Sequence, residues 1–211
     1  MRRQWPQSLI SWTSVLTGRL RDPIVGRDVL FGVGLGITWR LIGAIGDLIL
    51  LGPRTQPGFG QPDLLLGVRS TLGSWLLHMP NSIRGALLIF FLLFLLRVLL
   101  RNQWLAAVVT ALFFTLLNAL SSDHPVINGV ESMLIYVIIA ITLVRLGFLA
   151  LAAGLFVGGV LYSVPVTFDP SAWYFGSSLF MVGSVLVLAA WAFRTSIGGQ
   201  RLWKQDPFEK R

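Results

Sequence analysis

Cysteine is absent from the 211 residues, and histidine occurs only at His78 and His124. Without cysteine the chain has no disulfide, thiolate nucleophile or cysteine-ligated metal site. Two distant histidines with no HExxH pair do not form a usual zinc site. The phosphate-binding pattern GxxxxGK[ST] is missing as well. We therefore expect no catalytic, cofactor-binding or metal-binding residues, and no cofactor.

Charge is also scarce, because 12% of the residues are charged, whereas about 25% is usual in a soluble domain. Hydrophobic residues make up 55% of the chain and gather in runs such as residues 86–96, which contain no polar side chain. Runs of about 17–25 apolar residues cross a bilayer as helices, since a helix satisfies its own backbone hydrogen bonds. The predicted fold class is an all-α integral membrane protein in contact with the lipid bilayer.

Six apolar stretches predict about six transmembrane helices, over residues 29–51, 83–100, 104–120, 126–144, 146–164 and 177–193. Only Arg145 separates the fourth and fifth, so the turn there must be tight, or the two form one kinked helix. We expect a juxtamembrane amphipathic segment (1–28), a polytopic transmembrane domain (29–193) and a basic cytoplasmic tail (194–211).

Two further stretches predict amphipathic helices at the membrane surface. Residues 7–20 place Leu9, Trp12 and Leu16 on one face, which favours a helix lying on the bilayer. The alternative for this stretch is a packed helix of a soluble neighbouring domain. The long connection 52–82 carries a second apolar face over residues 65–79. We interpret it as a second surface helix or a re-entrant element, and a seventh, short span is the alternative.

The net charge of +8 indicates orientation rather than a nucleic-acid partner, because the basic residues flank the apolar stretches. With both termini in the cytoplasm, thirteen of the 17 basic residues lie on the inner side: Arg2, Arg3, Arg19, Arg21, Arg27, Arg97, Arg101, Arg145, Arg194, Arg201, Lys204, Lys210 and Arg211. This arrangement satisfies the positive-inside rule. We predict a multi-pass protein of a bacterial inner membrane with both ends cytoplasmic.

Two charged residues, Arg40 and Asp47, stand within the first predicted span. Seven residues place them on one helical face about 10 Å apart along the axis, which we estimate is too far for a direct bond. An unpaired charge in a bilayer is costly, so each needs a partner from another span or from water. We expect a polar contact between helices, with Asp47, Asp63 and Glu131 as possible partners of Arg40; the alternative is a functional polar path.

Glycines at Gly32, Gly36, Gly154 and Gly158 form two GxxxG patterns inside predicted spans. Small residues at this spacing let helix backbones approach closely. We expect these glycines to support a compact helix bundle and to allow a homo-oligomer.

Two segments resemble the membrane-embedded C-terminal region of a group of bacterial serine/threonine protein kinases. The first is residues 3–12 (RQWPQSLISW) followed by residues 18–30 (GRLRDPIVGRDVL), and the second is residues 171–179 (SAWYFGSSL) followed by 193–199 (FRTSIGG). Residues 94–104 (FLLRVLLRNQW) fit the middle of that region. The kinase motifs themselves, VAIK, HRD and DFG, are absent, so no phosphate-transferring residue can be assigned. The chain is either a stand-alone relative of the membrane module or a fragment of a longer protein.

The resemblance implies a non-catalytic membrane module that anchors a cytoplasmic kinase domain, in cis or in trans, and senses a signal for it. The alternative is a small transporter or channel-type subunit with Arg40 and Asp47 in a polar path. These hypotheses differ in structure, because a transporter requires a continuous polar cavity that reaches Arg40.

Overall fold

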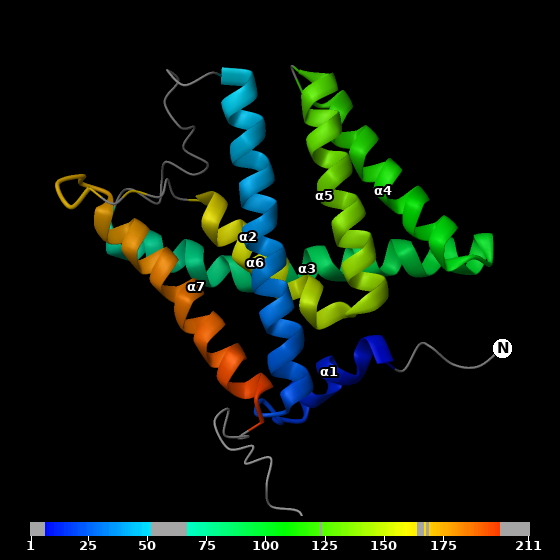
Figure 1. Cartoon of the computed structure of the whole chain (residues 1–211), viewed down its shortest axis with the longest axis horizontal. Coiled ribbons are helices and arrows are strands. Elements are labelled where there is room, and N and C mark those ends of the chain that lie inside the picture. The colour runs from blue at the N-terminus through cyan, green and yellow to red at the C-terminus, as the bar shows by residue number, and fades with distance from the viewer. Residues whose placement is uncertain (1–6, 52–66, 123, 164–166, 168, 199–211) are drawn as a thin grey trace, which may run out of the picture.

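The computed structural model describes residues 7–51, 67–122, 124–163, 167 and 169–198. Over these residues the chain forms seven helices and no strand (Figure 1). The helices are α1 (Gln7–Leu16), α2 (Pro23–Leu51), α3 (Val68–Leu100), α4 (Gln103–Leu120), α5 (Pro125–Arg145), α6 (Phe148–Ser163) and α7 (Phe175–Ser196). The predicted all-α class is confirmed.

Five of the helices, α2, α3, α4, α5 and α7, are long and apolar enough to cross a membrane. Each of them contains one of the predicted spans. The remaining predicted span, 146–164, corresponds to α6, which has 16 residues and is therefore about 24 Å long. Gly147, with φ 93°, lies in the turn that separates α5 from α6, so the two do not form one kinked helix.

The structure differs from the sequence prediction at α3. The expected second surface helix, residues 65–79, is not a separate element, because residues 68–79 form the first part of a 33-residue helix that continues through Pro80. The large apolar residues of this part, such as Val68, Leu76 and Leu77, are exposed, whereas Thr71 is buried. A polar inward face and an apolar outward face are typical of a helix inside the bilayer.

Helix α6 lies at the centre of the molecule (Figure 1). Eleven of its residues are buried, from Phe148 at its start to Ser163 at its end, and it contributes to all three clusters of the hydrophobic core. A helix that is apolar on every side is stable only when neighbours surround it. Around α6 stand α1, α2, α3, α5 and α7.

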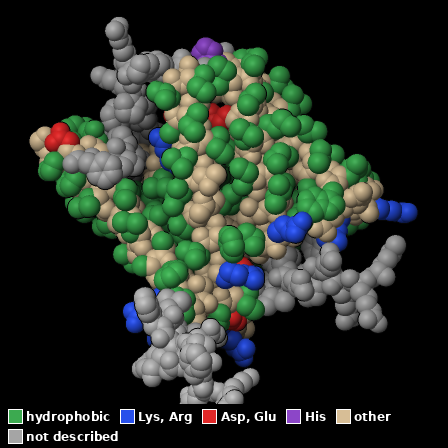
Figure 2. Space-filling view, viewed as in Figure 1, with side chains coloured by type: hydrophobic (Ala, Val, Ile, Leu, Met, Phe, Trp, Pro, Cys, Tyr) green, Lys and Arg blue, Asp and Glu red, His purple; other side chains and the backbone are tan. Residues whose placement is uncertain are grey.

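The outer surface of the bundle is apolar. Large side chains such as Ile49, Leu99, Leu120 and Val187 are each at least 67% exposed. Figure 2 shows hydrophobic side chains across the visible face, with most basic side chains along its lower and right-hand margins. A soluble monomer rarely exposes apolar patches beyond a few hundred Å². The fold is therefore that of a multi-pass membrane protein whose surface contacts lipid.

Candidate functional site

A polar pocket lies between α2, α5 and α6. It has a volume of about 300 Å³ and is lined by Trp39, Arg40, Gly43, Glu131, Leu155, Gly158, Gly159 and Tyr162. Its two charged residues come from different helices, Arg40 from α2 and Glu131 from α5. Concave sites of this kind, mostly apolar with a few convergent polar groups, are where small molecules bind.

Arg40 is half-buried and incompletely paired. Its Nη1 atom lies 3.9 Å from Oδ2 of Asp47, which is an ion-pair distance but longer than a hydrogen bond. Nη1 is buried and has no hydrogen-bond partner among the residues the structure describes. The sequence estimate placed Arg40 and Asp47 too far apart for a direct bond. They form no hydrogen bond at Nη1, but the length of the arginine side chain brings the two charges to ion-pair distance.

The two other expected partners of Arg40 are Glu131 and Asp63. Glu131 lies in the pocket wall beside the bare backbone of α2, and Asp63 lies outside the described residues. A Cβ atom added to Gly43 would stand 3.3 Å from Oε1 of Glu131 and 3.8 Å from Nη1 of Arg40. The missing side chain of Gly43 therefore leaves open the space between one carboxylate and one guanidinium.

Aromatic rings complete the pocket. The Cζ atom of Arg40 lies 5.9 Å from the centroid of the Tyr162 ring, within the range of a cation–π contact. Trp39 forms another part of the wall. These rings give the pocket apolar surfaces beside its two charges.

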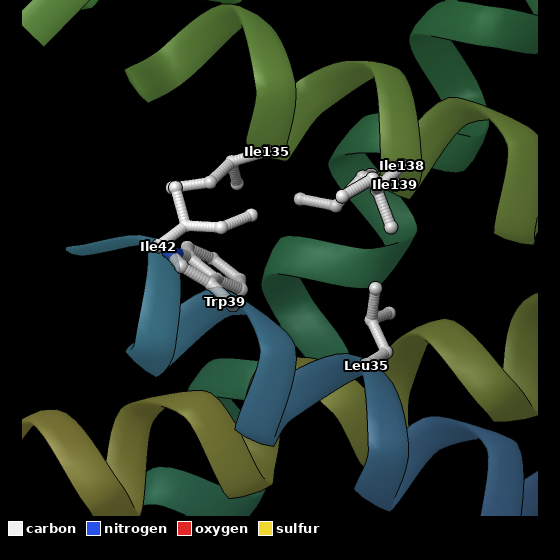
Figure 3. Close-up of a pocket in the computed structure, with 6 residues that line it drawn as sticks. All are labelled: Leu35, Trp39, Ile42, Ile135, Ile138 and Ile139. Atoms are coloured by element: carbon white, nitrogen blue, oxygen red, sulfur yellow. The ribbon is translucent and has the colours of Figure 1, made fainter. Parts of the chain in front are cut away.

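An apolar layer closes the space between α2 and α5 next to the pocket. Leu35, Trp39 and Ile42 of α2 meet Ile135, Ile138 and Ile139 of α5, and no room for a water molecule remains between them. Figure 3 shows these side chains pointing into the gap between the two helices. On the far side of the layer is a separate groove of about 350 Å³, lined mainly by apolar residues such as Leu30 and Phe31. The pocket at Arg40 is thus blind on this side.

The glycines of the two GxxxG patterns lie against each other where α2 crosses α6. A Cβ on Gly36 would stand 2.7 Å from the backbone nitrogen of Gly158, and one on Gly32 would stand 2.6 Å from the carbonyl oxygen of Ala150. No side chain larger than hydrogen fits there without separating the helices. Both GxxxG patterns form this contact within one chain, so their glycines do not lie on the lipid-facing surface.

A second polar feature, the polar seam, joins α3 to α6 and α7. Oγ1 of Thr71 lies 2.9 Å from Oγ of Ser177, and the Trp75 indole donates to Oγ of Ser184 at 3.1 Å. The third contact joins Nε2 of His78 to Oγ of Ser163 at 2.6 Å.

The hydroxyl of Ser163 donates to the carbonyl oxygen of Gly159, so Nε2 of His78 is the donor in its bond to Ser163. Gly159, which accepts this bond, also lines the pocket at Arg40. Sequence reasoning missed this seam. Its signal was the spacing of residues 71, 75 and 78, which places three hydrogen-bonding side chains on one face of a helix.

The GRLRDP segment forms the junction between α1 and α2. Gly18 adopts φ +77° after α1, a conformation that glycine reaches without strain. The Asp22 side chain accepts hydrogen bonds from the Ile24 amide at 3.0 Å and from the Ser14 hydroxyl at 3.3 Å. Asp22 thereby caps α2 and ties it to α1.

The next charged pair fixes the base of α2. Asp28 is 1% exposed, and its Oδ1 accepts hydrogen bonds from Nε and Nη2 of Arg27 at 3.1 and 2.9 Å. Gly26 packs so closely against the end of α7 that an added Cβ would lie 2.5 Å from the Ser196 nitrogen. The α1–α2 junction is therefore a packed part of the bundle.

Trp12 connects α1 to the central helix. Its ring meets that of Phe148 edge to face, with centroids 4.9 Å apart, and Phe148 is the first residue of α6. A helix thus exists over the expected stretch, and it packs on the bundle. Helix α6 begins at Phe148, beside Trp12 of α1, and its last turns line the pocket at Gly158, Gly159 and Tyr162. One buried helix therefore links α1 to the pocket.

No group of three or more histidine, aspartate or glutamate side chains within the described part of the chain could hold a metal ion. The acidic and basic residues of the tail from 199 onward lie outside the described residues. The chain matches no protein-family model, no curated protein and no solved structure.

Proposed function

We propose that this chain is a non-catalytic, ligand-sensing membrane module that anchors a bacterial serine/threonine kinase domain on its cytoplasmic side. The observation that carries the proposal is the path of α6. Its first residue, Phe148, packs on Trp12 of the juxtamembrane helix, and its last turns line the pocket at Arg40. A ligand that binds the pocket better in one arrangement of α6 shifts the population toward that arrangement, and α1 moves with it.

The orientation in the bilayer is part of the proposal. Arg19, Arg21 and Arg27 stand around the α1–α2 junction, and Arg145 and Arg194 stand at the ends of α5 and α7. In Figure 1 the α1–α2 junction and the end of α7 lie at the lower end of the molecule, and α5 ends above them, toward the same side. The positive-inside rule assigns this end to the cytoplasm, in a bacterial inner membrane. Six crossings, α2 through α7, then bring the chain back to the side from which it started.

The link to a kinase rests on the resemblance to kinase-associated membrane regions of residues 3–12 with 18–30, 94–104, and 171–179 with 193–199. Asp22 joins α2 to α1, and Gly26 packs against the end of α7; both lie within residues 18–30, at the end that we assign to the cytoplasm. A domain attached before α1 would therefore be joined to a packed platform.

The transporter alternative is less well supported. It requires a continuous polar path through Arg40, whereas the apolar layer beside the pocket leaves no room for water. A pocket that is blind in this way suits a receptor, which binds without releasing its ligand to the other side.

The test is a phosphotransfer assay on the product of the native locus. A C-terminal affinity tag is added on the chromosome, and the tagged protein is purified from membranes and incubated with radiolabelled ATP and a generic substrate. Serine/threonine phosphorylation should accompany the native product, while the separately expressed 211-residue chain should neither bind ATP nor phosphorylate. A native product free of kinase activity, or activity in the 211-residue chain itself, would contradict the proposal.

A further inference from the structure

The pocket at Arg40 presents one positive and one negative group to the same small space. Nη1 of Arg40 and Oε1 of Glu131 both lie within 4 Å of the position that a Cβ on Gly43 would occupy. Within the described residues the two groups do not form an ion pair with each other, and the ion pair of Arg40 is with Asp47. Asp47, whose side chain is 61% exposed, does not line the pocket. The pocket itself therefore carries no net charge but has separated charges.

The guanidinium has unused donors. At 3.9 Å from Asp47, Nη1 is beyond hydrogen-bond distance, and it is buried without a partner in the described chain. A buried donor left unsatisfied is costly, and a carboxylate is the acceptor that an arginine fork binds best. The arginine side of the pocket thus favours an anionic group.

The carboxylate of Glu131 faces the same space from α5. Gly43 and Gly46 leave the surface of α2 bare beside it, so that a Cβ on Gly46 would come within 2.6 Å of Oε2. No other basic side chain lines the pocket. Glu131 is therefore placed to accept hydrogen bonds from an ammonium group of a ligand.

The remaining wall is apolar. Trp39, Leu155 and Tyr162 border a volume of about 300 Å³, at the lower end of the range for small-molecule sites. We infer that the pocket binds a small zwitterion with an apolar side chain, of the size of an aliphatic α-amino acid. Its carboxylate would lie at Arg40, its ammonium group at Glu131, and its side chain against the aromatic rings.

This inference names the ligand class for the sensing part of the proposed function and rests on that part alone. The two charges of a zwitterion are what distinguish it from the other occupants of such a pocket. An amine or metal cation needs only Glu131, and a carboxylate or phosphate needs only Arg40.

The test measures binding to the full chain in lipid nanodiscs by isothermal titration calorimetry. L-leucine is the zwitterion, 4-methylpentanoate lacks its ammonium group, and 3-methylbutylamine lacks its carboxylate. Leucine should bind at least tenfold more tightly than either analogue. Equal or tighter binding of the amine or of the carboxylate, or no binding of leucine by folded protein, would overturn the inference.

Two charge variants test which pocket residue binds each charged group of the ligand. Arg40→Gln should weaken leucine binding at least tenfold and leave any binding of the amine unchanged, whereas Glu131→Gln should weaken leucine binding and leave that of the carboxylate unchanged. Arg84→Gln, which removes an exposed arginine of α3 outside the pocket, is the matched control. Should a charge variant fail to fold, Gly43→Ala keeps both charges, fills the space between them and should abolish leucine binding.

A fluorophore on Leu16→Cys separates this inference from the proposed function. Leu16 is exposed at the end of α1, and the chain has no native cysteine. Leucine binding that changes the fluorescence supports both ideas. Binding without any change at α1 contradicts the sensing function and leaves the ligand class standing. A kinase-linked native product whose pocket binds only one of the mono-charged analogues contradicts the ligand class alone.

Discussion

Charged side chains are few in this protein, and the aspartates among them differ in their surroundings. Asp28 is fully buried and bonded to Arg27, whose own side chain is 56% exposed. Asp169, by contrast, stands in the exposed loop before α7. The carboxylate of Asp28 therefore depends on a contact inside the protein, whereas that of Asp169 is exposed to solvent.

Replacement of Arg27 by methionine should destabilise the protein. The buried carboxylate of Asp28 would lose the hydrogen bonds that it accepts from Nε and Nη2, at a cost of about 1–3 kcal/mol. Arg19→Met removes the same charge from an exposed position and should change stability by less than about 0.5 kcal/mol. Unfolding in mixed micelles, followed by circular dichroism, measures both. Equal effects would show that the Arg27–Asp28 contact adds nothing beyond net charge.

The turn before α7 makes a prediction about pH. The hydroxyl of Ser171 donates to Oδ1 of Asp169 at 2.7 Å, and the Ser171 amide donates to the same atom at 2.9 Å. Both bonds favour the charged carboxylate, so the pKa of Asp169 lies below its ordinary value.

Ser171→Ala should therefore raise the pKa of Asp169 toward that of an ordinary aspartate, because it removes the hydroxyl and keeps the amide. Carbon-13 NMR of labelled aspartate carboxyls during a pH titration reports the change. The stabilising effect of the turn exists above the unfolded pKa and disappears as pH falls through the lower folded pKa. An unchanged titration curve in the variant would show that the hydroxyl bond does not form in solution.

Among the helices, the crossing of α2 and α6 depends on glycine. The two backbones are in contact at Gly32, Gly36, Gly154 and Gly158, and the residues between them fill the surrounding core. Because α6 is the buried centre of the bundle, its distance from α2 also sets the width of the pocket and the position of Tyr162.

Gly36→Ala should destabilise the bundle by about 1–3 kcal/mol, the usual cost of overpacking, since its methyl group would meet backbone atoms of α6 at 2.7 Å. Gly34→Ala on the same helix is the matched control, because no atom lies within 4 Å of its added Cβ. The control should be neutral, or more stable by up to about 1 kcal/mol through helix propensity. Thermal unfolding in one detergent compares the two. A Gly36 variant as stable as the control would mean that the helices do not approach this closely.

At the scale of the whole molecule, the helices were largely predictable and their contacts were not. Apolar runs of bilayer length gave the positions of α2, α4, α5 and α7 to within a few residues, because each must bury its backbone in lipid. The first half of α3 was predicted as a separate surface helix or re-entrant element from its apolar face. The sequence does not show that other helices pack against its polar residues, such as Thr71 and His78.

The pocket shows the same limit. Arg40 was predictable as a residue in need of a partner, with Glu131 among three candidates, but which candidate lies near it depends on which helix packs beside α2. No local pattern carries that information, because the two residues are far apart in the chain. The blind apolar layer likewise consists of ordinary aliphatic residues whose spacing looks like any lipid-facing surface.

Cysteine labelling of intact cells tests the orientation of the whole chain. Single cysteines at Gln4 and Gln205, both outside the described residues, should be protected from an impermeant maleimide, whereas one at Ser121, exposed between α4 and α5, should react. The physical reason is the concentration of arginines at the end of the bundle that carries α1. Permeabilised cells, in which all three positions should react, are the control. Labelling of a cysteine at Gln4 or Gln205 from outside intact cells would contradict the predicted topology.

The length of α3 has a mechanical consequence. Its 33 residues extend for about 50 Å, while the hydrocarbon region of a bilayer is about 30 Å thick, and in Figure 1 this helix runs crosswise to α2. A helix so much longer than the membrane must lie steeply inclined. Longer lipid tails would let it stand more upright and would pull on the contacts that Thr71, Trp75 and His78 make with α6 and α7. A change in membrane thickness would thus act through α3 on α6, the helix that lines the pocket.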